Sequence, residues 1–294
     1  MAPRYDTVTF LSDYGRVDEF VGIVHSVIRS IAPHAAVVDL THDIHPYDVR
    51  AGGLALARSV PYLCPGVVIG VVDPAVGTPR RPIAVEVGDG ASVLVGPDNG
   101  LLAPAVAMCG GATRAVVLES EAHRLDSGAR TFDGRDIFAP AAAHLCSGVD
   151  LGELGPEVDP STLMPGLVPL SRSEEDEVVA EVLWVDRYGN VQLNVEPEDL
   201  LDFDDAVAVV VGDGPHTAHR VGTFAELGPG QLGLIVDSYG LVAVALDRDS
   251  AARELDVAAG SEVLIRSLDD ERPSGLVTPV TLSIRRTVGE GGAT

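Results

Sequence analysis

Basic residues and cysteines are scarce in this chain, and long apolar runs are missing. Its 20 basic residues stand against 44 acidic ones, which gives a formal net charge of −24. Nucleic acids and anionic membranes both require a basic face, so neither is expected as a partner. No apolar stretch reaches the ~18 residues that a membrane-spanning helix needs, and no arginine-rich start precedes an apolar signal core. We expect a cytoplasmic protein, and a small cation would suit its charge.

The three cysteines, Cys64, Cys109 and Cys146, are odd in number and widely spaced. This pattern fits neither a disulfide framework nor the paired knuckles of a zinc site, so we expect reduced, buried thiols. His42 and His45 lie three residues apart, but Pro46 follows them and an apolar run precedes them. The segment is therefore expected to be a loop without the fixed geometry of a helical metal site, and no metal is predicted.

The order of the apolar runs predicts an α/β fold with two domains. In the first half, short β-branched runs such as 7–11 and 36–40 alternate with helical stretches such as 18–31 and 48–60. This alternation indicates a largely parallel sheet with flanking helices. From residue 178 onward, strands separated by turns indicate a smaller antiparallel β-barrel. We expect an α/β domain over 1–165 and a barrel domain over 179–285, with 149–177 as a Gly-, Pro- and acid-rich linker.

Four polar turns lie beside apolar runs of the first half, at residues 12–15, 73–81, 97–100 and 131–136. Such turns converge at the carboxyl edge of an open α/β sheet, where ligands bind. The most informative one begins at Asp73, directly after the apolar run 67–72. A Pro/Gly turn there brings Arg80 and Arg81 back toward the carboxylate. The pattern indicates a site instead of a scaffold element.

Seven motifs, taken together, resemble one family. The segments are FLSDYG (10–15), VDLTHDI (38–44), VDPAVG (72–77), GPDNG (96–100), TFDGRD (131–136), DRYGN (186–190) and SYG (238–240). They are similar to those of the S-adenosylmethionine hydrolase (hydroxide adenosyltransferase) family, which is related to the fluorinating and chlorinating adenosyl transferases. The resemblance covers nearly the whole chain, and the motifs stand in the family's order.

The resemblance implies a cofactor-free hydrolase. Water or hydroxide displaces methionine from the 5′ carbon of S-adenosylmethionine and yields adenosine. The leaving group is a neutral thioether, so the protein has to supply only an oriented nucleophile and a dry pocket.

The resemblance also implies the catalytic residues. Asp73 and Arg80 match the first two members of the family's Asp-Arg-His set, with Arg81 as the alternative cation. The chain departs from the family at the third position, where Asp133 stands instead of histidine. A carboxylate can still accept a hydrogen bond from the attacking water, and the alternative role is that of a helix cap.

The expected binding residues follow from the same motifs. Asp13 is expected to hold the two ribose hydroxyls, with an N-cap as the alternative role, and Tyr47 to pack near the sugar. Tyr239 stands where the halogenating relatives carry arginine, which leaves the capture of the methionine carboxylate unexplained. The other residues expected around the substrate, including Asp186 for its ammonium group, are Asn99, Phe132, Asp186, Tyr188, Asn190 and Ser238.

The family arrangement implies a homotrimer, in which the barrel of one subunit closes the pocket of the next. Two other functions stay open on the residues alone. One is a nucleoside-binding protein that lost catalysis with the missing histidine. The other is a metal-dependent phosphoesterase that uses Asp13, His42, Asp43 and Asp73.

Overall fold

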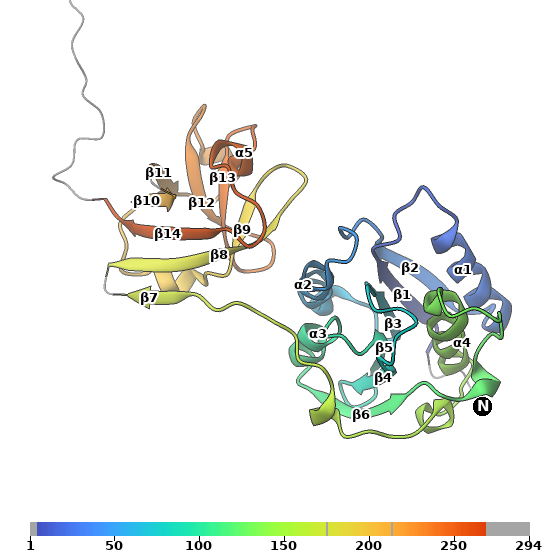
Figure 1. The fold of residues 1–294 in the computed structure, drawn as a ribbon. Helices are drawn as coiled ribbons and strands as arrows, with labels where there is room; N and C mark the ends of the chain where they lie inside the picture. The colour runs from blue at the N-terminus through green and yellow to red at the C-terminus, as the bar shows by residue number, and fades with distance from the viewer. Residues whose placement is uncertain (1–4, 175, 213, 269–294) are drawn as a thin grey trace, which may run out of the picture.

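The computed structural model describes residues 5–174, 176–212 and 214–268. An α/β lobe comes first along the chain and a β-barrel lobe second, and an extended segment joins them (Figure 1). None of the helices in these ranges has the length and apolar character that crossing a membrane requires.

The first lobe is built on a six-stranded sheet in the order β2-β1-β3-β5-β4-β6. The neighbours β2, β1, β3 and β5 are parallel, whereas β4 is antiparallel to both β5 and β6. The reversal arises because a tight turn, and not a helix, joins β4 to β5. The strands are β1 (Thr7–Ser12), β2 (Ala36–Thr41), β3 (Val67–Val71), β4 (Pro82–Val87), β5 (Ser92–Pro97) and β6 (Ala112–Val117).

Helices cover both faces of this sheet (Figure 1). Val8 and Phe10 of β1 pack in one core with α1 and α4, while Leu11 packs in the other core with α2 and α3. Burial on both faces is why the inner strands β1 and β3 are almost continuously apolar. The helices are α1 (Phe20–Ile31), α2 (Val49–Ser59), α3 (Ala103–Met108) and α4 (Ala139–Cys146), and the short helical turns are η1 (Val60–Tyr62), η2 (Glu121–His123), η3 (Gly134–Phe138, a π-helix), η4 (Leu151–Leu154) and η5 (Pro160–Thr162).

The second lobe is a barrel that seven strands close in the order β14-β10-β11-β12-β13-β9-β8, with β8 pairing back to β14. A short strand, β7, adds to the edge of β8. All neighbours are antiparallel except β11 and β12. The elements are β7 (Arg172–Glu174), β8 (Glu177–Val185), β9 (Val191–Leu193), η6 (Pro197–Leu200), β10 (Ala206–Val211), β11 (Gly214–Arg220), η7 (Phe224–Glu226), β12 (Leu232–Val236), β13 (Val242–Leu246), α5 (Ala251–Glu254) and β14 (Glu262–Ser267).

The predicted fold class, a largely parallel α/β sheet followed by a smaller barrel, is confirmed. The predicted linker is wrong in its first part. Leu151 and Leu154 are buried in the core of the first lobe, and Asp150 and Glu153 form a capping box around this turn. The domain limits 1–165 and 179–285 stay a prediction, and residues 1–4 and 269–285 lie outside the described ranges.

The expectation of buried thiols is correct only in part. All three cysteines are free, but Cys146 alone is buried, Cys109 is half-buried and Cys64 is exposed. Cys64 lies in the loop between η1 and β3, where no layer of the fold covers it.

Candidate active site

The polar turns after β1 and β3 and the segment 131–136 meet at one cavity, as predicted, and the loop after β2 joins them there. The fourth predicted turn, 97–100, does not line this cavity. Asp73 follows β3, and two successive turns bring the chain back from it. The amide of Val76 donates to the carbonyl of Asp73, and that of Thr78 to the carbonyl of Ala75. Gly77 has a φ of 80°, a left-handed conformation that favours glycine. This local geometry returns Arg80 to the carboxylate of Asp73.

Arg80 is shared by two carboxylates. Its Nε donates to both oxygens of Asp73 at 3.0 Å, and its Nη2 donates to Asp73 and to Asp133. The side chains of Arg80, Asp73 and Asp133 are only 9%, 5% and 13% exposed. Burial acts to lower the pKa of Arg80, but the hydrogen bonds and charges of the two carboxylates raise it above its ordinary value. The three predicted catalytic residues therefore form one ionic cluster.

Arg81, the alternative cation, points elsewhere. Its Nε donates to Asp98 at 2.8 Å, and its Nη2 donates to the carbonyl of Thr162 at 2.7 Å. The other oxygen of Asp98 accepts from the amide of Met164 at 2.8 Å. The Arg81–Asp98 pair thus fastens the start of the interlobe segment to the α/β lobe, and Arg80 is the partner of Asp73.

A cavity of about 330 Å³ lies beside this cluster. Asp13, Tyr47 and Phe132 line it together with Asp73 and Asp133, which brings five predicted site residues to one place. One oxygen of Asp13 accepts from the amide of Tyr47 at 2.9 Å, and Tyr47 has a φ of 70° with its side chain 73% exposed. This bond fixes the loop after β2 over the end of β1.

Tyr14 is a cavity residue to which the sequence alone assigned no role. Its ring packs edge-on against Phe132 with centroids 5.6 Å apart, and its hydroxyl lies where a Cβ on Gly134 would come within 2.3 Å. Burial first, and then the charges of nearby Asp13 and Asp73, raise the pKa of Tyr14 far above its usual range. The phenol therefore stays neutral. Gly134 opens a π-helix, an irregularity that is frequent at functional sites.

Asn99 does not line the cavity. Its Nδ2 donates to the carbonyl of Val72 at 2.9 Å, and its Oδ1 accepts from the amide of Leu101 at 3.1 Å. Both polar ends of the side chain are thus used to hold the turn after β5 against the end of β3. Asn99 therefore supports the site by holding these two segments together and does not line the cavity.

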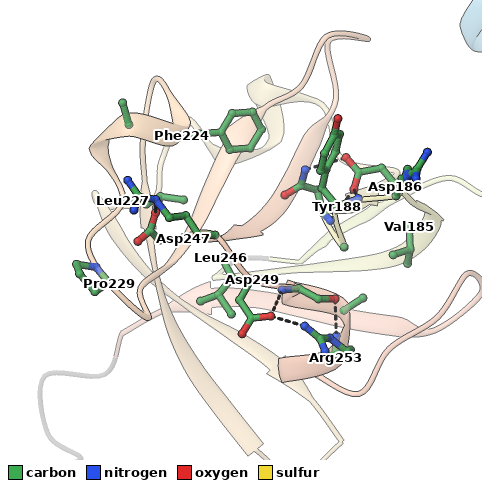
Figure 2. A pocket seen from close by; sticks show the side chains of 17 residues that line it. Val185, Asp186, Tyr188, Phe224, Leu227, Pro229, Leu246, Asp247, Asp249 and Arg253 are labelled. Carbon is green, nitrogen blue, oxygen red and sulfur yellow. Dashed lines mark hydrogen bonds and ion pairs between the residues drawn. The ribbon is translucent and has the colours of Figure 1, made fainter.

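The remaining predicted residues belong to the barrel lobe. Asp186, Tyr188 and Asn190 line a second cavity of about 1240 Å³ (Figure 2). Asp186 accepts from the amides of Tyr188 and Asn190 at 2.8 and 2.9 Å, and from the Asn190 side chain at 2.7 Å, which makes this loop rigid. Ser238 lies on another loop, between β12 and β13, where its carbonyl accepts from Tyr62 at 3.3 Å.

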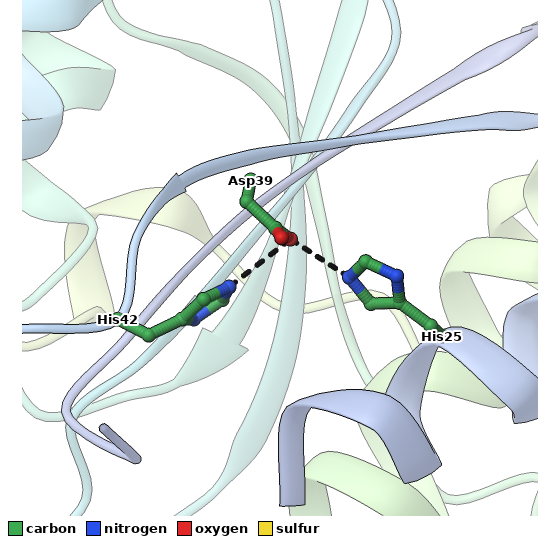
Figure 3. A group of neighbouring side chains, drawn as sticks. All are labelled: His25, Asp39 and His42. Carbon is green, nitrogen blue, oxygen red and sulfur yellow. Dashed lines mark hydrogen bonds and ion pairs between the residues drawn. The ribbon is translucent and has the colours of Figure 1, made fainter. Parts of the chain in front are cut away.

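The histidine pair of the sequence does not converge. His42 is fully buried, whereas His45 is exposed and its ring nitrogen faces the carbonyl of Pro46 at 3.3 Å. In the described ranges one group of three metal-ligand side chains gathers, namely His25, Asp39 and His42 (Figure 3). The nearest Asp39 oxygen lies 2.7 Å from His25 and 3.0 Å from His42.

These distances are those of ion pairs and hydrogen bonds. The cluster lies behind the turn that carries Asp13 and supports it. Burial acts to raise the pKa of Asp39, but the contacts with His42 and His25 lower it below its ordinary value. The other ring nitrogen of His42 lies 2.8 Å from the hydroxyl of Ser12, directly before Asp13. The set proposed for a phosphoesterase, Asp13, His42, Asp43 and Asp73, forms no such group within the described residues.

Two family models match the chain. The SAM hydroxide adenosyltransferase N-terminal domain matches residues 8–155, and the C-terminal domain of the same family matches residues 180–264. The chain belongs to this family. The predicted resemblance is therefore confirmed.

Relatives and a solved structure extend the family match. The (R)-S-adenosyl-L-methionine hydrolase of Salinispora tropica is 45% identical, covering 90% of this chain and 99% of the relative. A fluorinase of Actinoplanes sp. is 24% identical, covering 88% of this chain and 96% of its own. The crystal structure of an uncharacterized conserved protein from Thermotoga maritima matches with a TM-score of 0.82 and 32% identity, over 88% of this chain and 99% of that chain.

We predict that Arg80→Met destabilises the protein by about 3–5 kcal/mol, because it leaves two buried carboxylates without their cation. Urea unfolding at pH 7 measures this loss. Adding Asp73→Asn and Asp133→Asn removes both charges and should recover most of it. Arg114 is a matched control, since it is also shared by two carboxylates, Asp150 and Glu157, which are 56% and 61% exposed. Arg114→Met should cost at most about 1 kcal/mol. Equal losses in the two single variants would contradict the prediction.

Proposed function

We propose that this protein hydrolyses S-adenosyl-L-methionine to adenosine and L-methionine. The observation that carries the proposal is the buried Asp73–Arg80 pair at the wall of a cavity that also holds Asp13, in a chain that belongs to the hydroxide adenosyltransferase family. Curated relatives at 40–45% identity are named (R)-S-adenosyl-L-methionine hydrolase. Since L-methionine fixes the α-carbon, we assign the (R) label to the sulfonium centre and propose the same epimer as substrate here.

The charge of the site supports a cationic substrate. Asp13, Asp73 and Asp133 bring three negative charges, and Arg80 brings one positive charge. The two negative charges left over suit a sulfonium ion, which loses its charge when the carbon–sulfur bond breaks. A halide nucleophile would instead meet like charge, at a cost of about 4 kcal/mol at 4 Å in a surface-like dielectric. Water is therefore the nucleophile we propose.

The proposed mechanism is an in-line displacement. Asp73, held by Arg80, accepts a hydrogen bond from a water molecule. A lone pair of this water oxygen then points at the 5′ carbon. A carbon–oxygen bond forms as the carbon–sulfur bond breaks. The electron pair of the carbon–sulfur bond goes to sulfur, and methionine leaves as a neutral thioether. The water proton passes to Asp73 and then to solvent. Asp13 would hold the ribose hydroxyls, and Phe132 and Tyr47 would exclude solvent around the sugar.

We predict that purified, chelator-treated protein releases adenosine and methionine in equal amounts from (R)-S-adenosyl-L-methionine, as chromatography would show. Asp73→Asn should lower the rate by roughly 10²–10⁴-fold and leave nucleoside binding largely intact. Glu157→Gln is the control, because it removes a carboxylate that pairs with Arg114 and does not line the cavity. A wild-type protein that binds substrate without turnover would indicate the binding protein. Activity on a phosphoester restored only by a divalent ion would indicate the phosphoesterase.

Asp133 is proposed to accept the second hydrogen bond of the attacking water. Asp133→Ala should lower turnover, while Asp133→His should retain it. Because imidazole titrates near pH ~6.5, above an ordinary aspartate, the acidic limb of the rate profile should move to higher pH in the histidine variant. An unchanged rate and pH profile in Asp133→Ala would leave this residue only a structural role as a partner of Arg80, since its side chain makes no capping bond to the π-helix.

The assembly we propose is a homotrimer with its active sites between subunits. The support is the separation of the predicted binding residues, since Asp186, Tyr188 and Asn190 line a barrel cavity that shares no residue with the one beside Asp73. Light scattering should give three times the 30.6 kDa chain mass, and a monomer mass would refute the arrangement.

A reducing compartment, the cytoplasm, suits the three free cysteines.

A further inference from the structure

The guanidinium of Arg58 has no counter-ion within the described residues. It lies in the last turn of α2 and takes part in none of the ion pairs or side-chain hydrogen bonds of these ranges. All 20 basic residues of the chain are arginines, and the chain contains 44 acidic residues. Among the half-buried arginines of the described residues, Arg58 is the one with neither an ion pair nor a side-chain hydrogen bond.

Two aromatic rings from the barrel hold this guanidinium. Its Cζ lies 4.5 Å from the ring centre of Trp184 and 5.8 Å from that of Tyr239. Burial lowers the pKa of Arg58, while the charges of Tyr239 and Asp237 act to raise it. Stacking on aromatic faces orients an arginine but leaves its N–H groups available for a planar anion.

The nearby carboxylate of Asp237 is already occupied. It accepts from the amides of Tyr239 and Leu241 at 2.8 and 3.2 Å, and also from the side chain of Gln192. These bonds shape the exposed turn that carries Ser238, and the hydroxyl of Tyr62 donates to the Ser238 carbonyl. The turn, the two rings and Arg58 thus form one preorganised surface at the junction of the lobes.

The catalytic cavity lacks what this surface offers. None of the residues that line the cavity is basic, and the guanidinium of Arg80 is already shared by Asp73 and Asp133. The substrate under the proposed function nevertheless carries a carboxylate on its methionine part. A second cation would bind this carboxylate through charge-assisted hydrogen bonds.

We propose that Arg58, together with the hydroxyl of Ser238, binds the carboxylate of the methionine part of the substrate. The inference rests on the proposed function and assigns the residue that its amino-acid end requires. It also accounts for Tyr239 at the position where the halogenating relatives carry arginine. The ring of Tyr239 stacks on a guanidinium that comes from α2 instead of from the turn itself.

Arg58 and the cavity of the same chain are too far apart to hold one substrate. Tyr47, two residues before α2, lines the cavity, and Arg58 lies about 15 Å further along the direction of the helix axis. Only three carbons separate the sulfur from the carboxyl carbon of the substrate. We therefore place the cation in a neighbouring copy, which would present Arg58, Ser238 and Tyr239 to the cavity.

The test compares S-adenosyl-L-methionine with its decarboxylated analogue. Arg58→Met should lower kcat/KM for S-adenosyl-L-methionine about 10- to 100-fold, mainly through KM, as expected for a lost charged hydrogen bond. The same variant should leave kcat/KM for the decarboxylated analogue unchanged. Arg58→Lys, which keeps the charge but loses the planar fork, should give a smaller loss with the carboxylate substrate only.

Arg50→Met is the matched control, because Arg50 lies on the same helix at the same junction but is paired with Glu181 at 2.5 Å. Any loss in that variant should be equal for the two substrates. An equal loss for both substrates in Arg58→Met, or no loss at all, would overturn the proposal. If the wild type releases adenosine from neither substrate, the proposed function fails instead, and calorimetry with methionine alone then decides whether Arg58 binds the carboxylate.

Co-expressed subunits test the contribution of the neighbouring copy. Trimers that mix Asp73→Asn with Arg58→Met chains, purified through a separate tag on each, contain one intact interface in three. They should recover about one third of wild-type activity at low substrate concentration. Activity no higher than that of the two parent variants would overturn the placement of Arg58 between copies.

Discussion

The ionic cluster around Arg80 is the constraint on which the site depends. One guanidinium joins the turn after β3 to the segment that opens the π-helix, two parts of the chain that are 53 residues apart. Without the cation, two carboxylates would face each other in a buried place, which is costly. The cluster therefore exists before any substrate arrives, and its two carboxylates are in position without reorganisation. Because two carboxylates already balance the single charge of Arg80, it is not available to neutralise a substrate anion.

This division of charge separates the two ends of the proposed substrate. The negative cavity suits ribose and sulfonium, while the aromatic surface around Arg58 suits a carboxylate. Keeping the two apart prevents Arg58 from pairing with Asp73 or Asp133, which would silence both. The length of α2 supplies that separation within a chain.

Sequence reasoning succeeded where chemistry is local. Buried strands announce themselves by β-branched runs, and the turn from Asp73 back to Arg80 is encoded by its own Pro and Gly residues. It failed where contacts are distant. Leu151 and Leu154 are buried in the core of the first lobe, which the composition of their segment does not indicate. The side-chain amide of Asn99 donates to the carbonyl of Val72, 27 residues away. The neighbourhood of Arg58 depends on how two lobes pack, so no motif signals it. The roles of the site residues themselves remain predictions.

The bond network of Asp98 has a consequence for how this architecture can vary. Asp98 and Arg81 clamp the backbone at Thr162 and Met164 to the same turn that Asn99 braces. The free length of chain between the two lobes thus begins at residue 165 and not at the end of β6, the last strand of the sheet. Insertions in a surface loop upstream of the clamp leave the barrel where it is. A single residue gained or lost between 165 and 171, by contrast, changes the tether by about 3.3–3.6 Å and moves every barrel side chain relative to the pocket it would close. Length variation in this family should therefore be tolerated on one side of Met164 and selected against on the other.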